Sequence, residues 1–266
     1  MITSSLCATI LQVSDLHIGA TTDATLQGVN TAFYFQKVLA HAFSQHAIDY
    51  VVLTGDLAQT PCYSSYHHIK GYLAPYHVPC FCLPGNHDDY AIMEQIFIGE
   101  YFSCQKQIIL ENWQIICLNS QLIGSAKGYL ASEELSFLEA CLSAQPRHHA
   151  LIAMHHHCLP THSHWLDTMM ISNNQQLFTI THRFPQAKAI IYGHIHQNAE
   201  NKLGTMMVWG TPSTCFQFKP HSPGFALDST SSGYRIVQLY NTGEVISNVF
   251  YLPEPLLGLQ LDAGGY

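Results

Sequence analysis

Residues 50–56 read YVVLTGD, a short apolar run that ends in a glycine and a carboxylate. Apolar runs of this length, rich in Val and Leu, are typical of strands that are buried on both faces of an α/β sheet. Four more such runs occur along the chain, at residues 6–13, 78–83, 150–154 and 189–192. The sequence therefore predicts an α/β fold built on five buried strands.

A helix is predicted between the first two of these strands. Asn30 can serve as its N-cap, and apolar residues follow at helical spacing, at positions 35, 38, 39, 42 and 43. Residues 234–240 and 245–251 resemble two strands joined by a turn, which predicts an antiparallel pair. We therefore expect one domain with mixed sheets over residues 1–252, followed by a loose C-terminal tail, residues 253–266.

Composition excludes several classes of protein. The chain of 266 residues is 47% hydrophobic and 11% charged, which is typical of a globular protein rather than a disordered one. It carries 18 acidic and 10 basic residues, a formal net charge of −8, and this balance argues against sequence-independent binding of nucleic acid. No apolar run approaches the roughly 20 residues that cross a bilayer, and residues 1–7 lack the cationic start of a secretory signal. We expect a cytoplasmic protein with reduced cysteines and no membrane segment.

Polar donors follow all five predicted strands. They are Asp15 and His17, then Asp56, then Asn86, then one of His155, His156 and His157, and finally His194 and His196. Ligands of open α/β sheets bind beyond the carboxyl ends of the strands, so we expect these donors to converge on one crevice. Imidazole at neutral pH is chiefly a metal ligand or a proton carrier. The sequence therefore predicts a metal site, and the spacing leaves open which of the three consecutive histidines takes part.

Seven ligands are too many for one tetrahedral zinc ion, which favours a pair of ions. Asp56 stands alone on its strand end and has two carboxylate oxygens, so it is the natural bridge between ions about 3.5–4 Å apart. Mixed oxygen and imidazole donors without a thiolate suit manganese, iron, zinc or cobalt better than copper(I) or calcium.

The charge of such a site favours a phosphate substrate. Two divalent ions, two carboxylates and a bridging hydroxide leave a net charge of about +1, where an anionic phosphoryl group would dock. The metal-bound hydroxide can then attack phosphorus in line with the leaving oxygen. His87, next to Asn86, is the candidate general acid for that oxygen. Asp88 either orients the His87 ring or caps the helix that starts near Asp89.

Three further features keep two interpretations each. His156 and His157 either contact metal or substrate, or support the ligands from behind. Residues 211–216 either line a nucleotide pocket or form an ordinary turn. Asn30 either contacts the substrate or only caps its helix.

The order of these motifs resembles the calcineurin-like metallophosphoesterase superfamily: D-x-H at 15–17, G-D at 55–56, G-N-H-D at 85–88, H-H-H at 155–157 and G-H-x-H at 193–196. Segments 26–31, 54–59, 83–88, 165–167, 193–197 and 211–220 further resemble the bacterial class III 3′,5′-cyclic-AMP phosphodiesterases, and the likeness spans residues 6–251. The resemblance implies a metallophosphoesterase domain over residues 1–252 with a four-layer αββα sandwich, in which two mixed β-sheets are flanked by helices.

The resemblance also implies a division of the ligands. One metal would take Asp15, His17, Asp56 and His196, and the other would take Asp56, Asn86, His155 and His194. The choice of His155 follows from matching the first of the three histidines to the family's ligand. His17, Asn86, His87 and His196 would contact the substrate. The sequence departs from the family at Cys158, where a proline usually follows the histidines.

The function that follows is hydrolysis of 3′,5′-cyclic AMP to 5′-AMP by a dinuclear metal-dependent phosphodiesterase, with His87 protonating the 3′-oxygen. The first alternative is a broad-specificity phosphodiesterase or phosphomonoesterase acting on 2′,3′-cyclic nucleotides or nucleic-acid ends. The second is a non-catalytic, metal-bound nucleotide sensor or protein-binding module. The expected partner is a small cyclic nucleotide, and the oligomeric state stays open.

Overall fold

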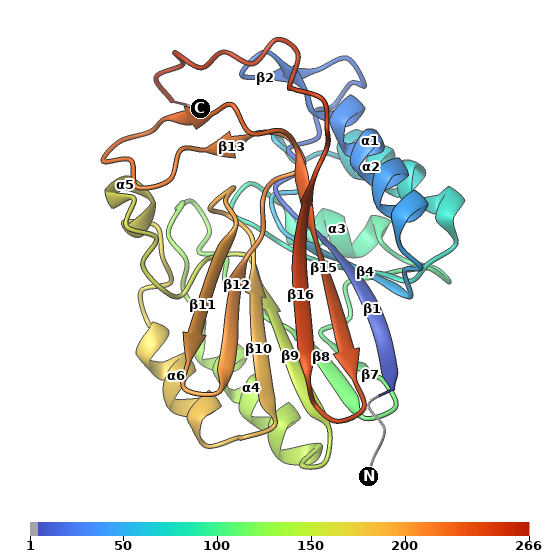
Figure 1. Ribbon diagram of the computed structural model, residues 1–266, viewed down its shortest axis with the longest axis vertical. Coiled ribbons are helices and arrows are strands. Elements are labelled where there is room, and N and C mark those ends of the chain that lie inside the picture. The colour runs from blue at the N-terminus through green and yellow to red at the C-terminus, as the bar shows by residue number, and fades with distance from the viewer. Residues whose placement is uncertain (1–4, 266) are drawn as a thin grey trace.

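Two six-stranded mixed sheets lie face to face in the computed structural model, which describes residues 5–265 (Figure 1). The first sheet has the order β16-β15-β1-β4-β5-β6, with β1 at Leu6–Val13, β4 at Tyr50–Thr54, β5 at Cys80–Leu83, β6 at Phe102–Ser103, β15 at Gly233–Tyr240 and β16 at Val245–Tyr251. The second has the order β11-β12-β10-β9-β8-β7, with β7 at Gln107–Ile109, β8 at Trp113–Cys117, β9 at His149–Met154, β10 at Ala187–Tyr192, β11 at Ala199–Leu203 and β12 at Met206–Gly210.

Helices flank both sheets, which confirms the four-layer sandwich. In Figure 1, α1, α2 and α3 lie on the side of the first sheet, and α4 and α6 lie on the side of the second. Their bounds are Thr31–Gln45 for α1, Tyr63–Leu73 for α2, Ala74–Tyr76 for the 3₁₀ turn η1, Tyr90–Ile96 for α3, Ser132–Ala144 for α4, His164–Asp167 for α5 and Asn174–His182 for α6. Two small hairpins complete the fold, β2 (Thr25–Leu26) with β3 (Val29–Asn30), and β13 (Gln217–Phe218) with β14 (Leu227–Asp228).

The apolar runs are continuous because each central strand is covered on both faces. Val52 of β4 and Leu151 of β9 belong to the core between the two sheets. Their neighbours Val51 and Ile152 belong to the second core, which also contains Phe35 of α1. Because side chains alternate between the faces of a strand, a strand buried on both sides needs an apolar residue at every position.

All five strands predicted from apolar runs are present, as β1, β4, β5, β9 and β10, with bounds within two residues of those expected. The first three run parallel in one sheet and the last two run parallel in the other. Their carboxyl ends lie at one end of the sandwich, the end that also holds α5, β13 and the C-terminal segment (Figure 1). The candidate ligands therefore come from two facing sheets rather than from a single open sheet.

Two local predictions are confirmed. The side chain of Asn30 accepts a hydrogen bond of 2.8 Å from the Phe33 amide, so Asn30 caps α1. Its amide nitrogen donates to the carbonyl oxygen of Thr22, and these two bonds account for the residue without a substrate. The strands β15 and β16 pair antiparallel, as expected.

The C-terminal tail follows β16 and returns to the β2–β3 hairpin. The amide of Leu257 donates to the Tyr34 hydroxyl at 2.6 Å, and the amide of Gln260 donates to the carbonyl oxygen of Gln27 at 3.0 Å. The side chain of Gln27 in turn donates to the carbonyl oxygen of Gly265. These contacts hold the described part of the tail against α1 and the hairpin. Two parts of the chain lie outside the described residues. They are residues 1–4, where no secretory signal is expected, and Tyr266, the last residue of the tail.

Within residues 5–265, no helix combines the length and the apolar character that a bilayer crossing requires.

Candidate metal centre

The seven predicted ligand residues form one group at the carboxyl ends of β1, β4, β5, β9 and β10: Asp15, His17, Asp56, Asn86, His155, His194 and His196. Asn86 is half-buried, and each of the other six exposes at most 5% of its surface. Buried carboxylates and imidazoles are costly unless they are paired or bind a cation. The group is therefore a strong candidate for metal binding.

The backbone of this group is strained. Asp15, His17, Asp56, His194 and His196 all have a positive φ, between 46° and 67°. Side chains other than glycine rarely adopt this left-handed conformation, and residues that do so cluster at functional sites. Five of the candidate ligands thus share a conformation that the surrounding structure must hold in place.

Two glycines let the strand ends approach each other closely. A Cβ atom at Gly85 would lie 2.2 Å from Oδ1 of Asp56, and one at Gly193 would lie 1.8 Å from Oγ of Ser14. Neither position has room for a side chain. The glycine of the G-N-H-D motif is therefore required by contact with the neighbouring loop of the same sheet, and the glycine of the G-H-x-H motif is required by contact with a loop of the other sheet.

One subset of donor atoms surrounds Nε2 of His196. This nitrogen lies 3.4 Å from Oδ1 of Asp15 and 3.3 Å from Nε2 of His17. Nε2 of His17 lies 3.9 Å from Oδ2 of Asp56. Two carboxylates and two imidazoles thus point at one small volume.

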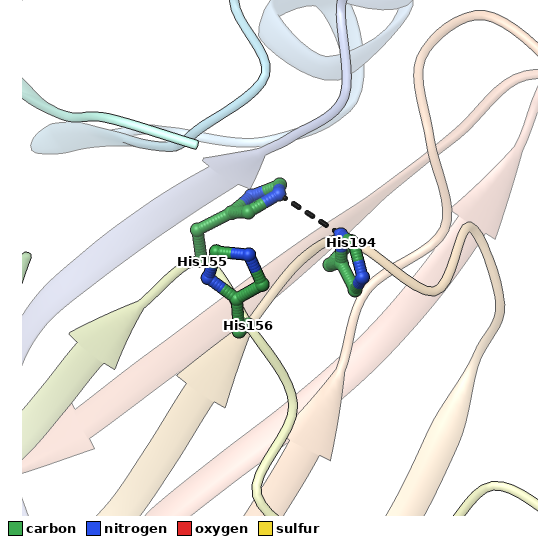
Figure 2. A group of neighbouring side chains, drawn as sticks. All are labelled: His155, His156 and His194. Carbon is green, nitrogen blue, oxygen red and sulfur yellow. Dashed lines mark hydrogen bonds between the residues drawn. The ribbon is translucent and has the colours of Figure 1, made fainter. Parts of the chain in front are cut away.

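The other subset surrounds Nε2 of His155. This nitrogen lies 3.2 Å from Oδ1 of Asn86, 3.3 Å from Oδ2 of Asp56 and 3.2 Å from Nδ1 of His194. Figure 2 shows the rings of His155 and His194 pointing toward each other, with His156 beside them. Oδ2 of Asp56 is common to both subsets, so this one oxygen lies between the two groups of ligands.

The imidazoles are oriented by oxygen acceptors on their far sides. Nδ1 of His155 lies 2.8 Å from the Thr54 carbonyl oxygen, and Nδ1 of His196 lies 2.9 Å from the carbonyl oxygen of Phe216. Nδ1 of His17 lies 2.7 Å from Oε1 of Gln59. A carbonyl oxygen can only accept, so each Nδ1 carries a hydrogen and each Nε2 is left to bind a cation.

The spacing of the donors fits metal ions. Ligand bonds of about 2.0–2.1 Å in a tetrahedral arrangement separate two donors by roughly 3.3 Å. The Nε2 atoms of His17 and His196 are 3.3 Å apart, and the Nε2 of His155 and Nδ1 of His194 are 3.2 Å apart. Nitrogen lone pairs that face each other at this distance repel unless a cation or a proton lies between them. The residues therefore fit a pair of divalent ions.

The carboxylates set the protonation of the metal-free histidines. Burial is the largest single effect and lowers the pKa of His155, but the charge and hydrogen bond of Asp56 together with the charge of Asp15 outweigh it and raise the pKa to about 9. Burial also lowers the pKa of His196, and there the charge and hydrogen bond of Asp15 together with the contact of Cys215 outweigh it and raise the pKa to about 10. At His17 burial prevails and lowers the pKa to about 3. Protons thus occupy part of the site where metal ions would bind.

Of the three consecutive histidines, His155 lies at the centre of the second subset. His156 belongs to a group of potential ligand atoms with His155 and His194, and its Nδ1 lies 2.8 Å from Oγ of Ser120. His157 is fully buried, and its Nε2 lies 3.9 Å from Oδ1 of Asp167. Neither ring nitrogen of His157 has a hydrogen-bond partner among the described residues. His156 therefore offers a nitrogen within 4.8 Å of the ligand atoms of His155 and His194, whereas His157 lies beside Asp167.

His87 is half-buried at the edge of the group. Its amide donates to Oδ1 of Asp56 at 2.9 Å, and its Nδ1 lies 3.3 Å from the carbonyl oxygen of Gln59. The ring is 5.0 Å, centroid to centroid, from the ring of His17. The side chain is thus placed beside the candidate ligands, with its position set by the same loops.

Both interpretations of Asp88 are wrong. Its carboxylate accepts hydrogen bonds from the amides of Leu57, Ala58 and Gly85, and α3 is capped by Asp89 instead. The Tyr66 hydroxyl donates to the same carboxylate, while the contact of the His87 Nδ1 atom is with Gln59. Burial raises the pKa of Asp88 to about 6. Asp88 holds the loop that carries Asp56, because four donors surround it.

Residues 211–216 are buried and contact the loops that carry the candidate ligands. Oγ of Ser213 donates to the carbonyl oxygen of Asp15 at 2.8 Å, and the amide of Thr214 donates to that of Ser14 at 3.2 Å. The carbonyl oxygen of Phe216 accepts from His196. This segment therefore braces the ligands of β1 and β10. The sequence did not predict the roles of Ser213, Gln59 and Tyr66. Gln59 and Ser213 lie in segments that resemble the family, 54–59 and 211–220, and Tyr66 lies in none of them.

The chain matches known proteins over nearly its whole length. A family model described as calcineurin-like phosphoesterase matches residues 8–198. The chain is 37% identical over 259 residues to the 3′,5′-cyclic adenosine monophosphate phosphodiesterase CpdA of Escherichia coli (strain K12), covering 97% of this chain and 94% of that protein. It is 33% identical over 248 residues to a 3′,5′-cyclic-nucleotide phosphodiesterase of Nostoc sp., covering 93% of each. Among solved structures, a dimetal phosphatase from Danio rerio shares the fold with a TM-score of 0.62 and 14% identity, covering 91% of this chain and 99% of that one.

Proposed function

Because this chain belongs to the calcineurin-like phosphoesterase family, we propose that it hydrolyses 3′,5′-cyclic AMP to 5′-AMP in a dinuclear metal site. The observation that carries this proposal is the arrangement of the donor atoms in two subsets that share Oδ2 of Asp56. A single carboxylate oxygen between two groups of ligands is the arrangement that two-metal phosphoesterases need.

The proposed ligands follow the two subsets. Asp15, His17, Asp56 and His196 would hold one ion, and Asp56, Asn86, His155 and His194 would hold the other. The short contacts around Nε2 of His196 and Nε2 of His155 support this division. Since the donors are oxygen and imidazole nitrogen, we propose iron or manganese as the ions, with zinc or cobalt as alternatives. When bound, two such ions lower the pKa of a shared water and neutralise charge on the phosphoryl group.

The side chains around the ions position the phosphate. We propose that His17, Asn86, His87 and His196 contact the phosphoryl oxygens. Asn86 and His87 reach this place because Asp56 accepts the His87 amide and Asp88 accepts the Gly85 amide. Both bonds fix the turn that carries them, so the phosphate would meet a rigid set of partners.

His87 is the proposed proton donor to the 3′-oxygen. Its Nδ1 faces the carbonyl oxygen of Gln59, which can only accept, so Nδ1 keeps a hydrogen. In the imidazolium form the ring also carries a hydrogen on Nε2, and this is the hydrogen that passes to the departing alkoxide. The ribose 3′-oxygen is a poor leaving group, so this proton lowers the barrier to breaking the bond.

A direct assay tests the proposal. The metal-loaded protein is incubated with 3′,5′-cyclic AMP, 2′,3′-cyclic AMP, 5′-AMP and bis(p-nitrophenyl) phosphate, and products are separated by chromatography. The proposal expects 5′-AMP from 3′,5′-cyclic AMP with a kcat/KM above those of the other esters. Equal kcat/KM values across the panel would favour a broad-specificity esterase. Tight nucleotide binding without any product would favour a sensor.

Two further parts of the proposal concern the whole chain. We assign the phosphoesterase domain to residues 1–252 and the tail to residues 253–266. All nine cysteines are free thiols. Free thiols in this number suit a reducing compartment, which supports a cytoplasmic location.

A further inference from the structure

An aromatic cavity adjoins the candidate metal centre. It has a volume of about 240 Å³. Asn86, His87 and His194 line it on the side of the metal centre, and Trp165, Phe218, Phe225, Met169, Ala126 and Gly265 complete its walls. A group attached to a phosphate at the metal centre could therefore enter this cavity while the phosphate stays in place.

Three aromatic rings of this cavity form a cage. The rings of Trp165 and Phe218 are 4.9 Å apart at 76°, and those of Trp165 and Phe225 are 5.4 Å apart at 69°. Phe218 and Phe225 are 5.6 Å apart, also at 69°. Rings that meet nearly at right angles stabilise one another by edge-to-face contact and cannot collapse into a flat stack. The cage therefore keeps its shape as a receptor for an apolar, planar group.

Trp165 also carries an unpaired polar atom. Its indole Nε1 is buried, and it has no hydrogen-bond partner among the described residues. A buried N–H group without a partner costs free energy, and tryptophan normally finds an acceptor when it is buried. An acceptor on a bound ligand would satisfy it. Apolar walls and one donor together suit a heteroaromatic ring rather than a simple hydrocarbon.

The cage is fixed to the metal centre and to the protein. The ring of Phe218 stacks on the ring of His196 at 4.1 Å and 17°. Trp165 lies on α5, where Oδ1 of Asp167 accepts 2.7 Å hydrogen bonds from the amide and the hydroxyl of Thr161. The cavity is thus rigidly placed relative to the phosphate position, as a site for a specific ligand requires.

A second cavity, which Asn86 and His87 also line, suits a nucleobase less well. It has a volume of about 590 Å³ and is lined by Asp89 and Glu94, together with the strongly exposed Ile123. Its carboxylates would repel an anionic nucleotide, and it contains none of the three caged rings. The aromatic cavity is therefore the better of the two sites for a nucleobase.

We propose that the cage of Trp165, Phe218 and Phe225 binds the nucleobase of the substrate, with Trp165 as the main determinant of selectivity for nucleotides over simple phosphate esters. The inference rests on the proposed function, since the phosphate must lie at the metal centre. Stacking on an aromatic side chain is favourable for every base, and the indole N–H adds an acceptor-specific contact.

The test compares a nucleotide with its base-free counterpart. The metal-loaded full chain is assayed with 3′,5′-cyclic AMP and with methyl riboside 3′,5′-cyclic phosphate, which lacks the base. Trp165→Leu should lower kcat/KM for the nucleotide about tenfold and leave that for the base-free ester within twofold. Trp165→Phe keeps an aromatic ring and should lie between the wild type and Trp165→Leu. Ile123→Ala, in the second cavity, is the matched control and should change neither value.

A binding measurement keeps the inference separate from the proposed function. The affinities for 5′-AMP and for ribose 5-phosphate are measured by calorimetry on the same proteins. The inference expects 5′-AMP to bind about tenfold more tightly to the wild type, with the advantage lost in Trp165→Leu. A wild type that binds in this way but hydrolyses nothing would refute the proposed function only. The inference itself fails if Trp165→Leu affects both members of each pair equally, or if Ile123→Ala removes the preference.

Discussion

Replacement of Asp56 by asparagine removes the charge that the two ligand subsets share. Asparagine has nearly the same shape and keeps an oxygen that can accept the amide of His87, a contact of 2.9 Å. It puts an amide group where Oδ2 lies 3.3 Å from Nε2 of His155. The substitution therefore tests the shared carboxylate with little change in packing.

The magnitude follows from the metal-free protein. The pKa of His155 stands at about 9 against an ordinary 6.5, and this net difference favours the protonated ring by roughly 3 kcal/mol. Burial of the ring favours its neutral form, so loss of the Asp56 charge should bring the pKa of His155 below 6.5. Histidine resonances titrated by NMR in chelator-treated protein report this value. Asp167→Asn, which alters a carboxylate 3.9 Å from His157, is the control and should leave His155 near 9.

The same variant should lose metal and activity together. We expect wild-type protein to hold two ions per chain by elemental analysis, and Asp56→Asn to hold fewer. Turnover of cyclic AMP should fall at least about 100-fold, because two-metal stabilisation supplies several kcal/mol. An asparagine variant that keeps both ions and wild-type turnover, or a His155 pKa that stays near 9, would refute the reasoning.

The remaining predictions concern the proton donor, the glycine contact and the histidine protons that metal binding displaces. His87→Ala should keep both ions and slow cyclic AMP hydrolysis about 10²–10⁴-fold, but slow bis(p-nitrophenyl) phosphate much less, and equal slowing would reject its role as the acid. Gly85→Ala would place a Cβ atom 2.2 Å from a carboxylate oxygen and should lower stability by about 1–3 kcal/mol in thermal melts. Its control is Gly71→Ala in α2, where no atom lies within 4 Å, which should raise the melting temperature; equal shifts would contradict the contact argument. The pKa values of His155 and His196 are raised to about 9 and 10, so metal loading at pH 7 should release about two protons, measured by calorimetry in buffers of different ionisation enthalpy. Because these values are raised on folding, the stability they give the metal-free protein is complete below pH 6.5 and is lost as pH rises through 9 to 10; a melting temperature independent of pH in that window would contradict the assignment.

The strands of the fold were predictable where burial leaves only apolar residues. Residues 50–54 became β4 with the expected bounds because both faces of the strand are covered. The central strand β8 gave no such signal, since the polar Gln114 interrupts it. Gln114 is fully buried and accepts a hydrogen bond from Gln107 on the neighbouring strand β7. That pairing is a tertiary contact, which the local sequence pattern does not contain.

In the candidate site, too, local features were predictable from the sequence and tertiary contacts were not. The donors were predictable because each follows its strand directly and carries recognisable chemistry. Asp88 was misinterpreted because adjacency to His87 in sequence implied contact, whereas its carboxylate turns toward the amides of Leu57 and Gly85. Trp165 and Phe218 gave no signal as a cavity, since aromatic residues are common in cores and these come from distant segments.

Anomalous diffraction from crystals of manganese-loaded protein tests the central claim most directly. The account predicts two peaks about 3.5–4 Å apart, with Asp56 between them, one bound by His17 and His196 and the other by His155 and His194. A single peak, or a second peak that does not contact Asp56, would contradict it.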